Sequence, residues 1–255
     1  MVGMTLNCGM ADEVMEPGGR TRLYVTADLG EGVALPLSDG HMHYLLHVLR
    51  AKAGDHVRLF NGRHGEWSAE LETVTKRGVI VRLKAQTAPQ VPAPDVWLVF
   101  APVKKTPGEY LVQKATELGA AKLQPVFTRR TIAARINEER LLANAVEAAE
   151  QSERVCVPEI AAPLKLEKLL DAWPAERTLY FCDEGGDAKP LAAAAKPGPA
   201  AILTGPEGGF DPAERELLRS KSFVVPVTLG PRILRADTAA LAALAVWQAV
   251  AGDWT

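Results

Sequence analysis

Residues 200–214, with the sequence AAILTGPEGGFDPAE, place an apolar segment, a glycine-rich loop and a helix start in direct succession. The first five residues are mostly apolar and have the length of a buried strand. Asp211, Pro212 and Glu214 are residue types favoured at the N-cap, first and third positions of a helix. A buried strand that leads into a capped helix is the repeating unit of a parallel sheet covered by helices.

The same alternation extends through the second part of the chain. Its strand-like segments are continuously apolar, which indicates strands buried on both faces of a parallel sheet. We therefore predict an α/β domain over residues 95–255. No G-x-G-x-x-G motif follows its first strand, which argues against a Rossmann dinucleotide-binding domain. The predicted strands lie at residues 95–101, 122–127, 178–182, 200–204 and 223–229, and the predicted helices at 107–118, 138–152 and 236–250 and from residue 211 onward.

The first part of the chain has shorter strand-like segments that turn residues separate, and these predict a small β-barrel over residues 20–88. A helical turn at 41–50 is expected to bury Leu45, Val48 and Leu49 on one face. Three prolines between residues 88 and 94 predict a stiff linker. Residues 1–19, which carry three acids and no Lys or Arg, predict a disordered extension. The predicted strands lie at 56–60, 66–73 and 78–84.

The composition is that of a soluble globular protein, with 47% hydrophobic and 24% charged residues in a chain of 255. The longest apolar run, residues 239–251, contains Gln248 and is shorter than the ~20 residues of a membrane helix. No secretory signal pattern is visible, and Cys8, Cys156 and Cys182 are too scattered for a metal or disulfide framework. We therefore expect a cytoplasmic protein with no metal site and no membrane partner.

Positive charge is concentrated in the first module. Residues 20–90 carry ten Lys or Arg against seven Asp or Glu, and all five histidines of the chain, although the net charge of the chain is -2. Residues 91–255 carry nineteen Lys or Arg against twenty-one Asp or Glu. A basic, histidine-rich module beside a mildly acidic one favours contact between the first module and an anion such as RNA.

The glycine-rich loop 204–210 lies at the carboxyl end of its strand, where open α/β sheets bind ligands. Gly205, Gly208 and Gly209 allow the backbone to approach a ligand closely. A phosphate cradle is disfavoured, because no Lys-Ser/Thr pair follows the glycines and Glu207 would face the anion. The loop suits a neutral or cationic ligand, such as adenosine attached to a sulfonium. The alternative is a tight turn before a helix.

A second unusual loop, residues 229–238 with the sequence LGPRILRADT, follows the last predicted strand. Arg232 and Arg235 flank an apolar pair, and Asp237 or Thr238 is the predicted N-cap of the final helix. Arginine side chains suit carboxylates and phosphates, although both arginines can equally be solvated. Because both loops follow strands of one sheet, we predict that they line one pocket.

Both loops, in this order and spacing, resemble the signature of the RsmE family, the 16S rRNA (uracil-N3)-methyltransferases of the SPOUT superfamily. The resemblance runs from about Arg20 to the C-terminus. It includes VLR at 48–50, QKATELG at 113–119 and EQSER at 150–154. The sequence departs from the family pattern at three places. Asp237 stands where the family usually has Glu, Glu153 stands where it often has Gly, and residues 106–109 also differ.

The resemblance implies an N-terminal PUA-like β-barrel that binds RNA and a C-terminal SPOUT domain with a deep trefoil knot. It implies a homodimer that acts on 16S rRNA or the small ribosomal subunit, with S-adenosylmethionine as methyl donor. The residues that it assigns to the donor pocket are Leu203, Thr204, Gly205, Glu207, Gly208, Gly209, Leu229, Gly230, Ile233, Leu234 and Thr238.

The chemistry of the acceptor suggests further roles. The N3 atom of uracil carries a proton and is a poor nucleophile, so a cation near the developing anion would help, and Arg235 or Arg232 is our candidate. The candidates for the base that removes the N3 proton are Asp237, Glu207 and water. The candidate RNA contacts are Arg22, Arg50, Lys52 and Arg154. The alternative function is a non-catalytic RNA-binding protein that dimerises through the α/β domain.

Overall fold

The computed structural model describes residues 21–102, 105–132, 135–184 and 187–254. The chain divides into two compact units between Pro89 and Gln90, inside the proline-rich segment. The predicted disordered extension, residues 1–19, lies outside the described residues. Each unit is described by itself.

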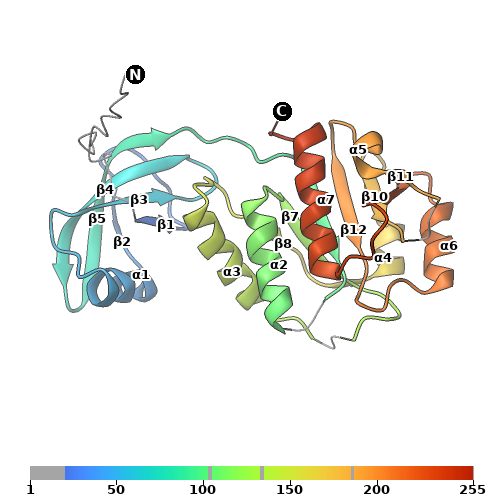
Figure 1. Cartoon of the computed structure of the whole chain (residues 1–255). Coiled ribbons are helices and arrows are strands. Elements are labelled where there is room, and N and C mark those ends of the chain that lie inside the picture. Colours follow the sequence, from blue (N-terminus) through green and yellow to red (C-terminus); the bar gives the residue numbers. More distant parts are fainter. Residues whose placement is uncertain (1–20, 103–104, 133–134, 185–186, 255) are drawn as a thin grey trace, which may run out of the picture. The chain divides into compact units, whose positions relative to one another are not determined.

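The first unit is built on a five-stranded sheet (Figure 1). Strand β1 runs parallel to β3, and the other neighbours are antiparallel. The three predicted strands are present, and two of them run further than the sequence indicated. Along the sheet the order is β1 (Arg22–Tyr24), β3 (His56–Phe60), β4 (Glu66–Thr75), β5 (Gly78–Ala88) and β2 (Ala34–Pro36).

The helical segment of this unit is wider than an α-helix over half of its length. Helix α1 (Asp39–His43) continues as the π-helix η1 (Tyr44–Val48). Leu45 is fully buried, whereas Val48 and Leu49 are 61% and 42% exposed. The backbone bond from Leu49 N to Tyr44 O spans five residues, so side chains spaced for an α-helix no longer share a face. The prediction that all three residues face the core is wrong for Val48 and Leu49.

The second unit contains the predicted parallel sheet, with eight strands among the described residues. Within the described residues, all neighbouring strands of this sheet are parallel, which confirms the α/β class. Along the sheet the order is β11 (Lys189–Pro190), β13 (Val224–Thr228), β10 (Thr178–Cys182), β12 (Ala200–Thr204), β6 (Val96–Phe100), β7 (Lys122–Phe127) and β8 (Glu159–Ile160), with β9 (Leu164–Lys165) also beside β7.

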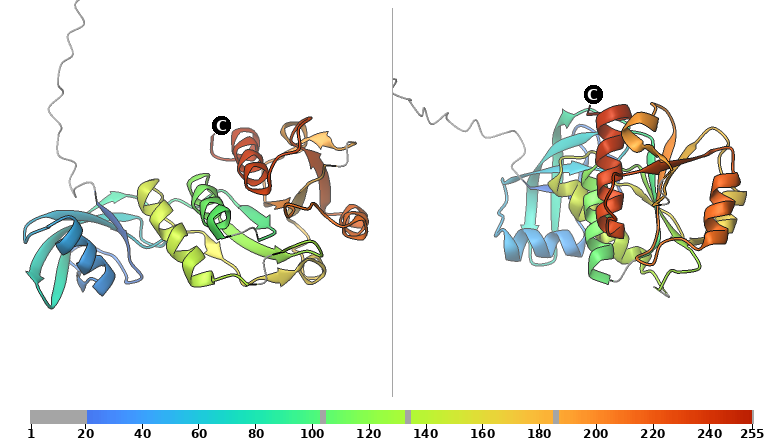
Figure 2. Two further views of the ribbon diagram at one scale, coloured as in Figure 1. Left: turned by 60° about the horizontal axis from the view of Figure 1, so that its bottom comes forward. Right: turned by 45° about the vertical axis from the view of Figure 1, so that its right-hand side comes forward.

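Helices cover both faces of this sheet, as the views in Figure 2 show. Both faces are apolar and need cover, as strand β6 illustrates. Leu98 and Phe100 belong to one apolar cluster, and Val99, between them, belongs to another. The first cluster includes side chains of α2 (Lys105–Glu117), α3 (Glu138–Gln151), α5 (Leu191–Ala194) and α7 (Ala236–Ala251). The second includes side chains of α4 (Leu166–Asp171) and α6 (Pro212–Ser220).

Two helix ends follow the sequence closely, and a third does not. Asp211 and Glu214 form the predicted capping box at the start of α6. Gly119, with φ +86°, ends α2 as expected. At α7, however, Arg235 occupies the N-cap and makes no side-chain capping bond. The prediction that Asp237 or Thr238 caps this helix is therefore wrong, because the helix begins earlier than its polar residues suggested.

Gln248, the polar residue that interrupts the apolar run of α7, has a structural role. Its side chain is completely buried. Its Nε2 atom donates to the carbonyl of Leu118 at 2.8 Å, and its Oε1 atom accepts from Asp253 N at 3.3 Å. The amide thus satisfies backbone groups at the ends of two helices. None of the helices within the described segments is sufficiently long and apolar to span a membrane.

Replacement of this amide tests its structural role. We expect Gln248→Ala to lower the free energy of unfolding by about 1–3 kcal/mol, because it leaves a buried carbonyl without a partner. Urea denaturation followed by circular dichroism measures the change. The control is Gln151→Ala at the exposed end of α3, expected within about 0.5 kcal/mol of the wild type. Equal stability of the two variants would contradict the role of Gln248.

Candidate active site

The three adjacent strands β12, β10 and β13 end at one edge of the sheet, and a cavity of about 830 Å³ lies there. The loops that follow these strands line it, so the structure brings the two loops singled out in the sequence to one pocket. The predicted residues that line the cavity are Thr204, Gly205, Glu207, Gly209, Leu229, Gly230, Arg232, Ile233, Leu234 and Arg235.

Four predicted site residues lie outside this lining. Leu203 is fully buried and packs with the cluster that includes α4 and α6. The carbonyl of Gly208 accepts a hydrogen bond from Arg130 Nη1 at 3.0 Å. Asp237 accepts from the backbone N–H of Thr238 at 2.7 Å, inside the first turn of α7. Leu203, Gly208, Asp237 and Thr238 thus lie next to the lining of this cavity, and their assignment to the site stays a prediction.

Gly205 stands where no side chain fits. A Cβ atom there would lie 2.6 Å from Cε2 of Phe210. The Phe210 ring is buried and packs edge-on against Phe181, with the ring centroids 5.0 Å apart, so it has little room to retreat. At Gly209, φ is +67° and a Cβ would collide with the carboxylate of Glu184. The glycines thus keep this wall of the cavity open.

A third loop, which follows β10, also belongs to this cavity and was not predicted from the sequence. Cys182, Asp183 and Glu184 line the cavity between the two loops that were predicted. Asp183 is buried and accepts hydrogen bonds from Arg215 Nε at 2.9 Å and Arg219 Nε at 2.8 Å. The sequence held a signal for this loop: DEGG at 183–186 is a glycine-bearing segment directly after a predicted strand, as is the loop at 204–210.

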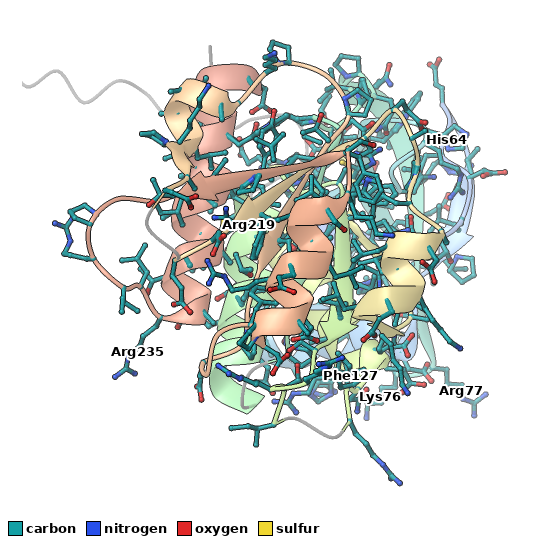
Figure 3. The ribbon with its side chains drawn as sticks, turned by 90° about the vertical axis from the view of Figure 1, so that its right-hand side faces the viewer. His64, Lys76, Arg77, Phe127, Arg219 and Arg235 are labelled. Carbon is teal, nitrogen blue, oxygen red and sulfur yellow. The ribbon has the colours of Figure 1, made fainter. Side chains whose placement is uncertain are left out.

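Partly exposed arginines bind the carboxylate of Asp183 beneath this site, and two exposed arginines stand at its rim. Hydrogen bonds to Asp187 and Asp183 raise the pKa of Arg219, which is labelled in Figure 3. Arg232 and Arg235 are exposed, and Arg235 points away from the fold in Figure 3. Ile233, between them, is 86% exposed. The rim arginines are therefore accessible to a large ligand, as the sequence interpretation requires.

A second cavity, of about 1060 Å³, lies at the carboxyl ends of β6 and β7. Pro206 and Glu207 of the glycine loop line both cavities. Most of the other lining residues come from the segment after β7 and from the first turn of α3, which the sequence analysis did not treat as a site. The lining includes Phe100, Arg130, Ile132, Arg135, Ile136 and Leu141.

The four predicted RNA contacts differ in accessibility. Arg50 and Lys52 are exposed in the first unit. Arg22 is only 5% exposed, its Nε contacts Glu66 Oε2 at 2.5 Å and its guanidinium lies over the Phe60 ring. Arg22 is therefore buried and ion-paired within the first unit, and its assignment to RNA stays a prediction.

Arg154 is also committed to the protein interior. Its Nη1 atom donates to the carbonyls of Thr116 and Ala120, at the end of α2 and just before β7. This is the amino-terminal edge of the sheet, opposite the edge that carries the two cavities. These bonds give Arg154 a structural role, and its contact with RNA stays a prediction.

Known proteins support an assignment of class. A family model for an RNA methyltransferase domain matches residues 90–248, and one for an RNA methyltransferase PUA domain matches residues 37–84. Ribosomal RNA small subunit methyltransferase E of Rickettsia conorii is 35% identical over 88% of this chain and 93% of its own length. The protein of the same name from Synechocystis is also 35% identical, over 88% of this chain and 76% of its own length.

Solved structures agree with the sequence matches. Ribosomal RNA small subunit methyltransferase E of Neisseria gonorrhoeae, bound to S-adenosyl methionine, has a TM-score of 0.85 and 28% identity, and the match covers 92% of this chain and 99% of that one. A putative methyltransferase of Legionella pneumophila, in complex with the same cofactor, has a TM-score of 0.80 and 30% identity, with 91% and 98% covered.

The two family models define the class, an RNA methyltransferase domain that follows a PUA domain. Within that class, the chain belongs to the ribosomal RNA small subunit methyltransferase E family. The resemblance to RsmE in the sequence motifs is thereby confirmed.

The reactivity of Cys182 provides a test of the cavity's interior. Burial raises the pKa of its thiol to about 12. At pH 8 only ~1 thiol in 10⁴ is then the reactive thiolate. We expect iodoacetamide to label Cys182 at least tenfold more slowly in the folded protein than in urea, as measured by peptide mass spectrometry. Similar rates in both states would contradict the raised pKa of the Cys182 thiol.

Proposed function

We propose that this protein transfers the methyl group of S-adenosylmethionine to N3 of a specific uridine in 16S rRNA of the small ribosomal subunit. The observation that carries the proposal is the single cavity that both glycine-bearing loops line at the ends of β12 and β13. Relatives and structural neighbours of the same family carry the name of the rRNA enzyme, and two neighbours hold the methyl donor.

The cavity suits the chemistry of this donor. Gly205 and Gly230 leave backbone groups uncovered at its wall, where they can hydrogen-bond to an adenine. Leu229 and Leu234 supply apolar surface for the ring. The carboxylate of Glu207 offsets the positive charge of a sulfonium, whereas the same carboxylate would repel a phosphate. When bound, S-adenosylmethionine supplies an electrophilic methyl group.

The rim of the cavity suits the acceptor. Arg232 and Arg235 are exposed cations beside the cavity, and we assign one of them to stabilise the negative charge that develops on uracil. Arg50 and Lys52, exposed in the first unit, are assigned to the rRNA backbone. In this proposal residues 20–88 bind RNA and residues 95–255 carry out methyl transfer.

The proposal includes a deep trefoil knot, a homodimer and a cytoplasmic location, as the family resemblance implies. Exposed apolar side chains on the helices of one sheet face are consistent with a partner subunit. These are Tyr110 of α2, Leu142 of α3 and Val250 of α7, which are 48%, 45% and 39% exposed. Burial of such side chains on association is favourable.

The site of modification tests the substrate assignment. We expect mass mapping of small-subunit rRNA from a strain without this protein to lack one N3-methyluridine. Purified protein and S-adenosylmethionine should restore that nucleotide in isolated small subunits. Unchanged rRNA in the deletion strain would contradict the proposal, and RNA binding without methyl transfer would favour the non-catalytic alternative.

The close contact at Gly205 provides a test of the donor pocket. We expect Gly205→Ala to weaken S-adenosylmethionine binding at least tenfold by calorimetry, because the new methyl group displaces the Phe210 ring that lines the cavity. The control is Gly78→Ala, where an added Cβ meets no atom within 4 Å. Unchanged affinity in Gly205→Ala would contradict this location of the donor.

A further inference from the structure

The second cavity adjoins the proposed donor cavity and has no role in the function proposed so far. The 830 Å³ of its neighbour lies within the about 300–1,000 Å³ of small-molecule pockets, and its own volume of about 1060 Å³ lies just above that range. Both cavities therefore have room for a nucleoside. Its lining includes Phe100, Ile136 and Leu141, which provide apolar surface for a planar base. The shared wall, Pro206 and Glu207, brings the two cavities into direct contact.

Charged side chains of both signs line this second cavity, with Glu109, Glu138 and Glu139 beside Arg130, Arg135 and Arg140. Arg130 donates to Gly208 O, and Arg140 forms an ion pair with Glu109. Arg135 is exposed and, within the part of the chain that the structure describes, has no hydrogen-bond or ion-pair partner. A free guanidinium beside an apolar interior suits a nucleotide whose base lies inside and whose phosphate lies at the rim.

We propose that this second cavity receives the acceptor uracil and that Glu207 is the base that accepts its N3 proton. The inference rests on the proposed function and extends it to the acceptor side. Donor and acceptor must lie next to each other for methyl transfer, and Glu207 belongs to the wall that both cavities share. Asp237, the other carboxylate considered, accepts from Thr238 N and lies outside both linings.

The chemical step balances with these groups. The Glu207 carboxylate takes the proton from N3, and the N3 electron pair forms a bond to the methyl carbon. The bond between that carbon and sulfur breaks, and its electron pair remains on sulfur. The products are N3-methyluridine, S-adenosylhomocysteine and a protonated Glu207, which returns its proton to water. A base in this position accelerates the step by about 10²–10⁴-fold.

An obstruction of the second cavity tests its role. Ile132 lines the cavity and is 76% exposed, so Ile132→Trp adds bulk at the cavity without disturbing the core. We expect kcat/KM for unmodified small subunits to fall at least tenfold, and Kd for S-adenosylmethionine to change less than twofold. The control is Glu167→Trp, at an exposed position of α4 outside both linings, which should behave as the wild type. Wild-type methylation by Ile132→Trp would overturn the assignment of this cavity.

The pH dependence of Glu207→Gln tests the base. We expect kcat at pH 7 to fall about 100-fold or more, because the amide cannot accept the N3 proton. The deficit should narrow as pH rises, since more uracil is then already deprotonated. The control is Glu147→Gln on the exposed surface of α3, with a wild-type profile. A pH profile and kcat equal to the wild type in Glu207→Gln would overturn its role.

The two levels of proposal fail in different ways. A wild-type protein that neither binds S-adenosylmethionine nor methylates small subunits contradicts the proposed function itself. The proposed function stands if the wild-type protein methylates small subunits and the Ile132→Trp and Glu207→Gln variants do so equally well. That second result removes only the assignment of the second cavity and of Glu207.

Discussion

The parallel alignment of β12, β10 and β13 is the constraint on which the rest of the site depends. Phe181 of β10 is paired with Leu203 on one side and with Pro226 on the other, so the three strands end at nearly the same level. The loops after them therefore emerge together, although β10 comes earlier in the chain than either neighbour. Without this alignment the glycine loop and the arginine loop would be two unrelated turns.

Buried carboxylates hold this edge of the sheet to its helices. Asp183, at the end of β10, binds Arg215 and Arg219 of α6. Glu214 of the same helix accepts from the backbone N–H groups of Asp211 and Arg129. Loss of one partner of a buried ion pair is strongly destabilising, so these contacts link α6 to the walls of both cavities. The positions of the open glycine loops thus depend on rigid charged contacts beneath them.

The sequence predicted the elements well and the long-range contacts poorly, for identifiable reasons. The capping box of α6 and the end of α2 at Gly119 depend on local chemistry and were found. The π-helix at Tyr44–Val48 was missed because its spacing differs from the pattern sought. Arg22 was taken as an RNA contact because its partner Glu66 is far away in the sequence.

By itself, the sequence determined the α/β class, most strand and helix positions, the two loops that line one cavity, and the family. These follow from periodicity, capping residues and motifs, which are all local. Only the tertiary structure decided that the loop after β10 joins this cavity, that Asp183 holds the strand end, and that Arg22 and Arg154 bind groups within the protein. The order of strands in the sheet brings distant segments together, and that order depends on packing across the whole domain.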